Sequence, residues 1–241
     1  NWFARAGQVP AMRYTFGRPD WLDSVIAEQT AVREAAGLFD QTSFGKISVR
    51  GPGSLALLQR LCANEMDVPA GRVVYTAMLN ARGGFESDLT VQRLGEHEFL
   101  LVTGTAQPVR DLAWLRRHRR NEDLAIEDVT AQWSVLSLMG PKAEAILGAL
   151  GVDDLSLDAF PANHFREFAI GAAQVRAVRV AYVGGPGWEL YIPAGHAAAL
   201  FDALHEAGRA HGLANGGYYA LDALRIEAGR RAFPAELSPE V

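Results

Sequence analysis

Hydrophobic and polar positions along this chain switch between the spacing of helices and the shorter alternation of strands. Leu22, Val25 and Val32 recur at helical spacing before a stop at Gly37, which predicts an amphipathic helix there. Apolar and β-branched runs bounded by glycines and polar turns predict the strands that follow. The elements expected next are a strand at 44–50, a helix at 54–63 with Ser54 as its N-cap, strands at 72–79, 88–94 and 99–103, a helix at 107–119 and a strand at 124–129.

Much of this order returns in the second half of the chain. The elements expected there are a strand at 133–139, a helix at 141–150, strands near 165–170, 174–182 and 188–192, a helix at 195–211 and a last helix at 218–228. Antiparallel hairpins that alternate with helices indicate an α+β fold with two related antiparallel-sheet and helix halves. We therefore expect a first subdomain at 22–130 and a second at 131–241.

An extended arm is expected at 1–21, before the first subdomain. It is rich in proline, glycine and aromatic residues, and we expect it to be ordered against the body through Trp2, Phe3, Tyr14, Phe16 and Trp21. The chain begins at Asn1 without an initiator methionine and stops in a proline-rich stretch at 233–241. Both ends predict a piece of a longer protein.

Bulk properties narrow the classes of function. Nucleic-acid binders usually carry a concentrated basic surface, so a net charge of −5 argues against a nucleic-acid partner. No apolar run approaches the ~18 residues that cross a bilayer, and we expect no membrane association. Cys62 is the single cysteine, which excludes an internal disulfide and fits the reducing cytoplasm of a bacterial cell. The histidines lack ligand spacing, so no metal site is expected.

Asp88 is the first residue with candidate chemistry. It follows the Gly83-Gly84 turn and is expected at the start of an otherwise apolar strand. An ionised aspartate is a poor strand former and costs free energy when it is buried unpaired, so its presence calls for a partner or a ligand. The alternative is that Asp88 caps the turn or pairs with one of the many arginines.

Glu189 has the same context in the other half, just after the glycine-rich turn at 184–187. This turn joins two strands and opens no helix, so it is not a dinucleotide-binding fingerprint. Together with Tyr75 and Tyr182, the two acids would furnish a polar cleft with aromatic walls, suited to a flat heterocycle with N–H donors. The alternative for Glu189 is an ordinary hairpin with a surface acid.

Arg225 lies in the last predicted helix, one turn from Asp222. The plain interpretation is a surface ion pair between residues three apart. Near the end of the helix, Arg225 would alternatively reach into the cleft and hold a carboxylate or Glu189.

Five segments resemble, in the same order, the landmarks of the aminomethyltransferase family, which has the fold of the glycine-cleavage T-protein. They lie at 38–46, 75–80, 83–91, 182–190 and 223–229. The resemblance covers nearly the whole chain and is closest to the folate-binding portion of dimethylglycine and sarcosine dehydrogenases or oxidases. The opening Asn1-Trp-Phe-Ala resembles the linker that leaves the flavin part of those proteins.

The resemblance implies tetrahydrofolate as the bound small molecule and a methylene iminium, derived from a methylated amine, as the source of the one-carbon unit. It implies that Asp88 is the catalytic group and that Glu189 binds paired N–H groups of the pterin. Tyr75 and Tyr182 would line the ring site, and Arg225 would support that wall. It also implies a covalently joined FAD domain before Asn1 and a closing C-terminal β-barrel, both outside this sequence.

Two departures from the family pattern stand out. T-proteins carry two consecutive acids where this chain has Ser87-Asp88, so the catalytic assignment falls on Asp88 alone. The turn at 184–187 lacks an acidic residue common in the family. The leading hypothesis is a folate-dependent methylene-transfer domain of a flavin-dependent amine oxidoreductase.

Two alternatives remain open at this point. One is a stand-alone aminomethyltransferase of the glycine-cleavage kind, against which the aromatic arm speaks. The other is a non-catalytic folate-binding or assembly module, similar to iron–sulfur cluster maintenance factors. Those factors carry a reactive cysteine, whereas Cys62 lies in an apolar helical run typical of core cysteines.

Overall fold

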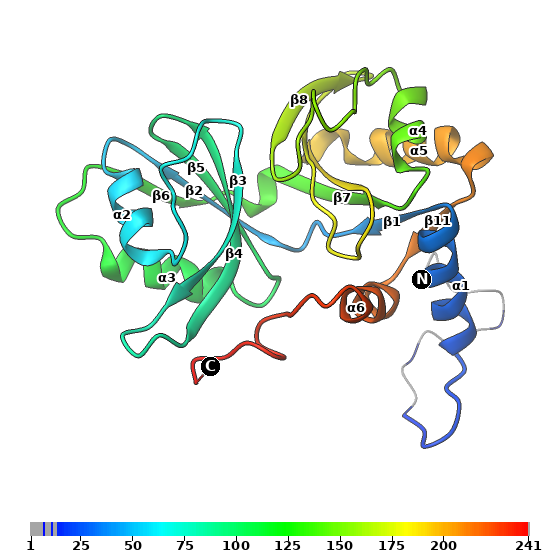
Figure 1. Cartoon of the computed structure of the whole chain (residues 1–241), viewed down its shortest axis with the longest axis horizontal. Coiled ribbons are helices and arrows are strands. Elements are labelled where there is room, and N and C mark those ends of the chain that lie inside the picture. The colour runs from blue at the N-terminus through cyan, green and yellow to red at the C-terminus, as the bar shows by residue number, and fades with distance from the viewer. Residues whose placement is uncertain (1–6, 8–10, 12–13, 241) are drawn as a thin grey trace.

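The computed structural model, which describes residues 7, 11 and 14–240, contains one antiparallel and one mostly antiparallel sheet, each covered by helices (Figure 1). The α+β class and the two sheet-and-helix halves predicted from the sequence are confirmed. Figure 1 shows the halves side by side, with the last helix and the C-terminal segment running beneath both.

The first half contains a sheet with the strand order β3-β4-β5-β2-β6. Its strands are β2 (Gly45–Arg50), β3 (Val73–Leu79), β4 (Phe85–Gly95), β5 (Glu98–Thr103) and β6 (Ala125–Asp128). The helices α2 (Ser54–Leu61) and α3 (Pro108–His118) cover one face. Leu57 and Leu58 of α2 and Leu115 of α3 are fully buried in its core, because the apolar stripes of both helices face the sheet.

The second half contains a sheet with the order β11-β1-β7-β10-β9-β8. Its strands are β1 (Ala36–Asp40), β7 (Trp133–Met139), β8 (Phe165–Ile170), β9 (Ala173–Val178), β10 (Gly187–Pro193) and β11 (Leu213–Gly216). Its helices are α1 (Leu22–Glu34), α4 (Ala143–Ala149), α5 (Ala197–Gly208) and α6 (Tyr218–Glu227), with short 3-10 turns at Thr130–Gln132, Ala194–His196 and Arg209–His211. Trp188 and Leu190 of β10 pack on the α4 and α5 side, whereas α1 and α6 pack against each other.

The strands β1 and β11 were missed by the sequence analysis. The first predicted helix ends at Glu34, and Ala36–Asp40 pairs in parallel with β11 and antiparallel with β7. These short segments carry no alternation of their own, so only pairing with distant strands defines them. As a result, α1 and β1 belong to the second sheet although they fall within 22–130. The division of the chain into domains at 130 stays a prediction.

Two local expectations were wrong. Gly53, not Ser54, is the N-cap of α2, because the Ser54 hydroxyl donates to the carbonyl oxygens of Gly51 (2.6 Å) and His97 (3.3 Å) instead of accepting from the helix. In the arm, Tyr14 and Phe16 are exposed, since no part of the described chain packs over them. Trp21 does pack, stacked on Tyr219. Trp2 and Phe3 lie outside the described residues.

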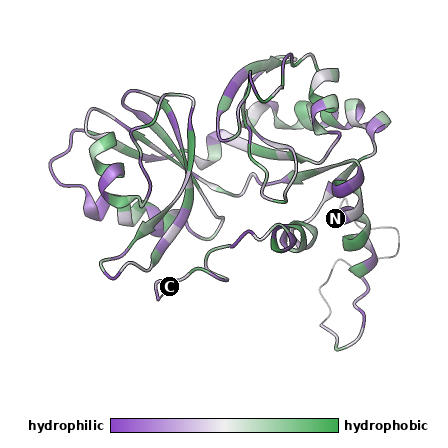
Figure 2. Cartoon of the chain, in the orientation of Figure 1, coloured by the Kyte–Doolittle hydropathy of each residue, from purple (hydrophilic) through white to green (hydrophobic). Residues whose placement is uncertain are grey.

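An apolar seam joins the two halves. Val73 and Val102 of the first sheet pack with Val135, Val178 and Tyr191 of the second. Figure 2 shows hydrophobic residues along the strands of both halves and hydrophilic ones in the loop between α3 and β6. Since side chains on a strand alternate between faces, the residues that share a face with this seam point toward the junction of the halves.

Removal of one core side chain tests the first half. Replacing Leu58, which is fully buried, by alanine is expected to lower the free energy of unfolding by about 2–5 kcal/mol. Leu157 is the matched control because it is 64% exposed, and its replacement by alanine is expected to change stability by about 0.5 kcal/mol at most. Urea denaturation of both variants measures the difference. Equal losses would contradict the placement of α2 on the sheet.

Candidate functional site

Asp88 is the fourth residue of β4, opposite Ala77 of β3. Its Oδ2 accepts a hydrogen bond of 2.9 Å from the hydroxyl of Tyr75, whose side chain is 56% exposed. No ion pair reaches Asp88 from the described part of the chain, so the pairing with an arginine considered above does not occur. The turn that precedes the strand bends at Gly83, where φ is +87° and glycine is favoured.

Burial raises the pKa of the Asp88 carboxyl group above its usual value. Hydrogen bonds from Tyr75 and Gln107 stabilise the anion and partly oppose this rise. The pKa of the Tyr75 phenol is also raised, first by burial and then by the neighbouring Asp88 charge. Asp88 is therefore a carboxylate with increased proton affinity beside a neutral phenol, which is the setting in which a carboxylate can act as a base near neutral pH.

Glu189 is in the middle of β10, between Ser137 of β7 and Val178 of β9. It is 9% exposed, so the surface-acid interpretation is wrong. The hydroxyl of Tyr191, two residues along the strand, donates to its Oε2 over 2.8 Å, and this is its one recorded hydrogen bond within the described residues. Burial raises the pKa of the Glu189 carboxyl group. A buried acid with spare acceptor capacity and no cation partner is suited to N–H donors of a ligand.

Tyr182 lies in the loop between β9 and β10, not at the end of a strand as expected, because β9 ends at Val178. Its side chain is half-buried against the cluster that contains α1 and α6. Burial raises the pKa of the Tyr182 phenol, and the Asp88 charge adds to that rise. Tyr182 of the second half is therefore within electrostatic range of Asp88 of the first.

The two acids face the same junction without touching. Glu189 shares a face of β10 with Tyr191, and Tyr191 packs in the apolar seam between the sheets. No contact joins Glu189 to Asp88 among the described residues, and each carboxyl group has its own tyrosine partner.

Arg225 is 4% exposed and fully engaged. Its guanidinium donates to Asp222 (2.8 Å), Glu236 (2.7 Å) and the carbonyl oxygen of Arg230 (3.0 Å). The pair with Asp222 is therefore present, but at a buried position, and no bond to Glu189 is recorded for the described chain. The contacts anchor residues 230–240, here called the C-terminal strap, to α6.

The C-terminal strap crosses from α6 to the turn between β3 and β4 (Figure 1). The backbone N–H of Phe85 donates to Ser238 over 3.0 Å, and the Asn80 amide donates to the carbonyl oxygen of Pro239 over 3.0 Å. The charge of Arg230 partly opposes the rise of the Tyr75 pKa that burial causes, in agreement with a strap that runs beside the candidate site. Arg225 thus anchors the strap, and within the described chain it makes no bond to Glu189.

Breaking the anchor of the C-terminal strap tests its role. Replacing Arg225 by methionine leaves Asp222 and Glu236 without their cation and is expected to release residues 230–240, because charge-assisted bonds hold them. We expect faster limited proteolysis within the strap and a lower melting temperature. Arg209→Met is the matched control, since Arg209 pairs with Glu206 on an exposed helix surface. Equal cleavage of both variants would argue against the anchor.

Sequence reasoning missed a polar cluster behind Asp88. Ser87, Thr103, Gln107 and Asp111 are 0–5% exposed and bonded to one another between β4, β5 and α3. An acid in the first turn of a helix is explained by its favourable interaction with the helix dipole, so the position of Asp111 alone does not indicate a functional residue. The available signal was the polar run around Gln107, directly before Pro108.

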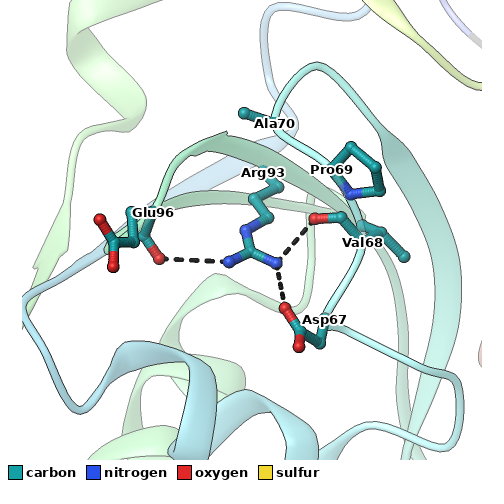
Figure 3. Close-up of a pocket in the computed structure, with 6 residues that line it drawn as sticks. All are labelled: Asp67, Val68, Pro69, Ala70, Arg93 and Glu96. Atoms are coloured by element: carbon teal, nitrogen blue, oxygen red, sulfur yellow. Dashed lines mark hydrogen bonds and ion pairs between the residues drawn. The ribbon is translucent and has the colours of Figure 1, made fainter.

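A shallow depression lies elsewhere on the first half, lined by Asp67, Val68, Pro69, Ala70, Arg93 and Glu96 (Figure 3). Its cation, Arg93, donates to Asp67 (2.6 Å) and to the carbonyl oxygen of Val68 (2.7 Å). It contains none of the predicted site residues, and its polar groups satisfy one another. We therefore assign the candidate site to the junction of the halves.

Other chemistry has little support in the described residues. They contain no cluster of three or more histidine, cysteine, aspartate or glutamate side chains that would hold a metal ion. Burial raises the pKa of the Cys62 thiol to about 12, which makes it a poor nucleophile at neutral pH. Within the part of the chain that is described, no helix has the length and apolarity to span a bilayer.

Similarity to known proteins agrees with this arrangement. The chain is 38% identical over 99% of its length to 4-methylaminobutanoate oxidase (formaldehyde-forming) from Paenarthrobacter nicotinovorans, and 35% identical over 99% to mitochondrial dimethylglycine dehydrogenase from Mus musculus. It spans 29% and 28% of those relatives. The fold matches the glycine cleavage system aminomethyltransferase T from Bartonella henselae, with a TM-score of 0.80, 28% identity and coverage of 90% of this chain and 57% of the other.

The family model described as the GCVT N-terminal domain matches residues 1–241. The match extends over the candidate site in both halves, including Asp88 and Glu189, and over the strap. The resemblance to aminomethyltransferases drawn from the sequence is confirmed, and the chain belongs to the GCVT N-terminal domain family.

Proposed function

We propose that this chain is the tetrahydrofolate-binding, methylene-transfer domain of a flavin-dependent N-methyl amine oxidoreductase of the dimethylglycine or sarcosine type. The observation that carries the proposal is the junction of the halves, where Asp88 is bonded to Tyr75 and the buried Glu189 is bonded to Tyr191 of the apolar seam, with no cation partner for either acid among the described residues. Membership of the family supports a folate-using aminomethyltransferase type of domain.

The residues at the junction fit a reduced pterin. The ring carries adjacent N–H groups, and a carboxylate can accept two of them at once in a planar arrangement. Glu189 accepts from Tyr191 with Oε2 alone, so acceptor capacity remains for such a pair. Tyr75 and Tyr182 offer partly exposed aromatic faces for the ring, and Arg225 would support this wall by anchoring the strap through Glu236.

Asp88 would act on the proton of the reacting amine. The folate amine nitrogen would attack the methylene carbon of an iminium ion, the π electrons of the C=N bond would move to the amine nitrogen, and the attacking nitrogen must lose its proton. The original amine would then leave with a proton, and the second folate nitrogen would close the methylene bridge and lose its own proton. Asp88 accepts the proton of the attacking nitrogen and stabilises the positive charge that develops nearby, which combines general-base and electrostatic catalysis. Tyr75 holds the other carboxylate oxygen, so Asp88 keeps a fixed orientation.

The parent protein would supply the iminium ion. The names of the relatives, an amine oxidase and a dimethylglycine dehydrogenase, together with the short share of each that this chain spans, support a covalently joined domain that oxidises the amine with FAD. In this view the partners are a reduced folate and an iminium from a methylated amine, with no nucleic acid or membrane, in the bacterial cytoplasm.

A second candidate is a stand-alone aminomethyltransferase, favoured by the close match in fold to the T-protein of the glycine cleavage system. There the same site would take the one-carbon unit from a carrier-bound aminomethyl group. A non-catalytic folate module is the third. Both alternatives use Glu189 and the tyrosines in the same way, whereas the non-catalytic module does not need Asp88.

The deciding experiment uses the full-length protein with dimethylglycine, sarcosine or 4-methylaminobutanoate, with and without tetrahydrofolate. We expect amine oxidation in both cases, formaldehyde without the folate and methylenetetrahydrofolate with it. Activity only with an aminomethyl-lipoyl carrier would favour the stand-alone transferase. Calorimetric folate binding without either activity would favour the non-catalytic module, and absence of folate binding would overturn all three.

A further inference from the structure

A chain of hydrogen bonds runs from the back of β4 to Asp88. Asp111 Oδ2 accepts from the hydroxyls of Ser87 (2.8 Å) and Thr103 (2.5 Å). The amide nitrogen of Gln107 donates to the Ser87 hydroxyl oxygen over 2.8 Å and lies 3.3 Å from the carbonyl oxygen and 3.5 Å from Oδ1 of Asp88. The cluster thus ends at the carboxylate that our proposed function makes catalytic.

The donors in this chain have one consistent direction. A serine hydroxyl has a single proton, and Ser87 gives it to the Asp111 carboxylate. Its oxygen must then accept from Gln107, which turns the amide nitrogen of Gln107 inward. The second N–H of that nitrogen is left for Asp88. The amide oxygen of Gln107 lies against Gly104, where a Cβ atom would collide with it.

The two oxygens of Asp88 are consequently held in different ways. Oδ2 accepts a good hydrogen bond from Tyr75 at 2.9 Å, whereas the one side-chain contact of Oδ1 with the described residues is the long contact with Gln107. An oxygen that accepts only a weak hydrogen bond keeps most of its basicity, and the weak bond still orients the carboxylate. Oδ1 is therefore the oxygen of Asp88 that is available to accept a proton.

The cluster is not what stability alone would select. Asp111 is 1% exposed, and its Oδ1 has no hydrogen-bond partner among the described residues. A buried carboxylate with an unsatisfied oxygen destabilises a fold, and an apolar residue would pack between α3 and the sheet without that penalty. Retention of such a group beside a candidate catalytic acid points to function.

We propose that Gln107 is a positioning residue for the transfer reaction, oriented by Ser87 and Asp111 so that its amide N–H aims and stabilises the Asp88 carboxylate. This inference rests on the proposed function of Asp88. The polar cluster behind β4 thereby has a role in the reaction that requires no contact with the folate or the amine.

The test compares Gln107→Leu with Gln59→Leu in the full-length protein. Gln59 is an exposed glutamine of the same half whose side chain accepts a bond of 2.8 Å from the backbone of Met66, away from Asp88. For Gln107→Leu we expect a rate of methylenetetrahydrofolate formation about 10-fold lower, with the folate dissociation constant within about 2-fold of wild type. Gln59→Leu is expected to behave as wild type.

The pH profile separates positioning from a merely structural effect. The Gln107 donor stabilises the Asp88 anion, so its loss raises the pKa of Asp88 and moves the acidic limb of the rate profile to higher pH. The titratable groups around Asp88, which are Tyr75, Tyr182 and Asp111, are unchanged in this variant. Gln107→Glu preserves the size, removes the donor and adds a negative charge beside Asp88, so we expect a larger shift in the same direction and a larger loss of rate.

The inference is overturned if folded Gln107→Leu and Gln107→Glu variants both retain the wild-type rate and pH profile, or if Gln59→Leu loses as much. Asp88→Asn distinguishes this failure from failure of the proposed function. An inactive Asp88→Asn variant beside fully active Gln107 variants sinks the positioning role alone. A fully active Asp88→Asn variant sinks both.

Discussion

Replacement of Asp88 by asparagine is expected to lower the rate of methylenetetrahydrofolate formation by at least about 10²-fold, because an amide cannot take the proton that general-base catalysis requires. The amide keeps the size of the side chain and can still accept from Tyr75, so the fold and the site remain intact. The affinity for tetrahydrofolate is therefore expected to stay within about 2-fold of wild type, as measured by calorimetry.

The proposed flavin part would supply an internal reference for this experiment in the full-length protein. Under the proposed function, amine oxidation in that part is expected to continue at the wild-type rate, so the one-carbon unit would leave as formaldehyde instead of methylenetetrahydrofolate. Asp67→Asn is the matched control, since Asp67 is an exposed aspartate of the same half that pairs with Arg93. An unchanged ratio of the two products in Asp88→Asn would reject the catalytic role.

The pH dependence of the same rate has a definite direction. Burial raises the pKa of Asp88, so the carboxylate is lost at a higher pH than for an ordinary aspartate when the pH falls. The wild-type rate should drop through this pKa, and the Asp88→Asn variant should lack that limb. A profile that is flat down to the usual aspartate range would contradict a buried base.

The sequence predicted well where a local signal coincides with the tertiary environment. The β3–β4 hairpin has apolar runs on both sides of a glycine turn, and both strands form with Tyr75 and Asp88 on one face. The glycine-rich turn before β10 likewise marks Glu189. In both places the informative observation was an acid among apolar residues, because burial of an unpaired charge costs free energy.

The misses share a physical cause. The pairing of β1 with β7 and β11 joins segments that are far apart in the chain, and the residues 36–40 have no period that announces a strand. Gln107 and Asp111 are ordinary residues at a helix start, and only the approach of β4 makes their bonds significant. Arg225 was predicted at the site, but its reach was decided by the C-terminal strap, whose path depends on both halves.

Glu189 illustrates how a buried acid can oppose stability. Its carboxyl group is buried without a cation, and burial raises its pKa, so the ionised form is disfavoured in the folded chain relative to the unfolded one. This raised pKa fixes the direction in which stability changes with pH. The folded state holds this proton more tightly, so the stability contributed by the group falls as the pH rises through the ordinary glutamate pKa and remains reduced above the folded-state value.

Glu189→Gln is therefore expected to raise the melting temperature of the protein without ligand at neutral pH and to weaken tetrahydrofolate binding about 10- to 100-fold. The amide avoids the cost of a buried charge, but it can no longer offer two anionic acceptors to the N–H groups of the pterin.

Calorimetric titration and thermal melts measure the two effects, and the gain in stability should vanish below the ordinary glutamate pKa. Glu127→Gln, at an exposed residue paired with Arg50, should change neither quantity appreciably. A Glu189→Gln variant that is more stable but binds the folate normally would place this acid outside the ligand site. The free-energy cost of burying the charge would then not be offset by binding.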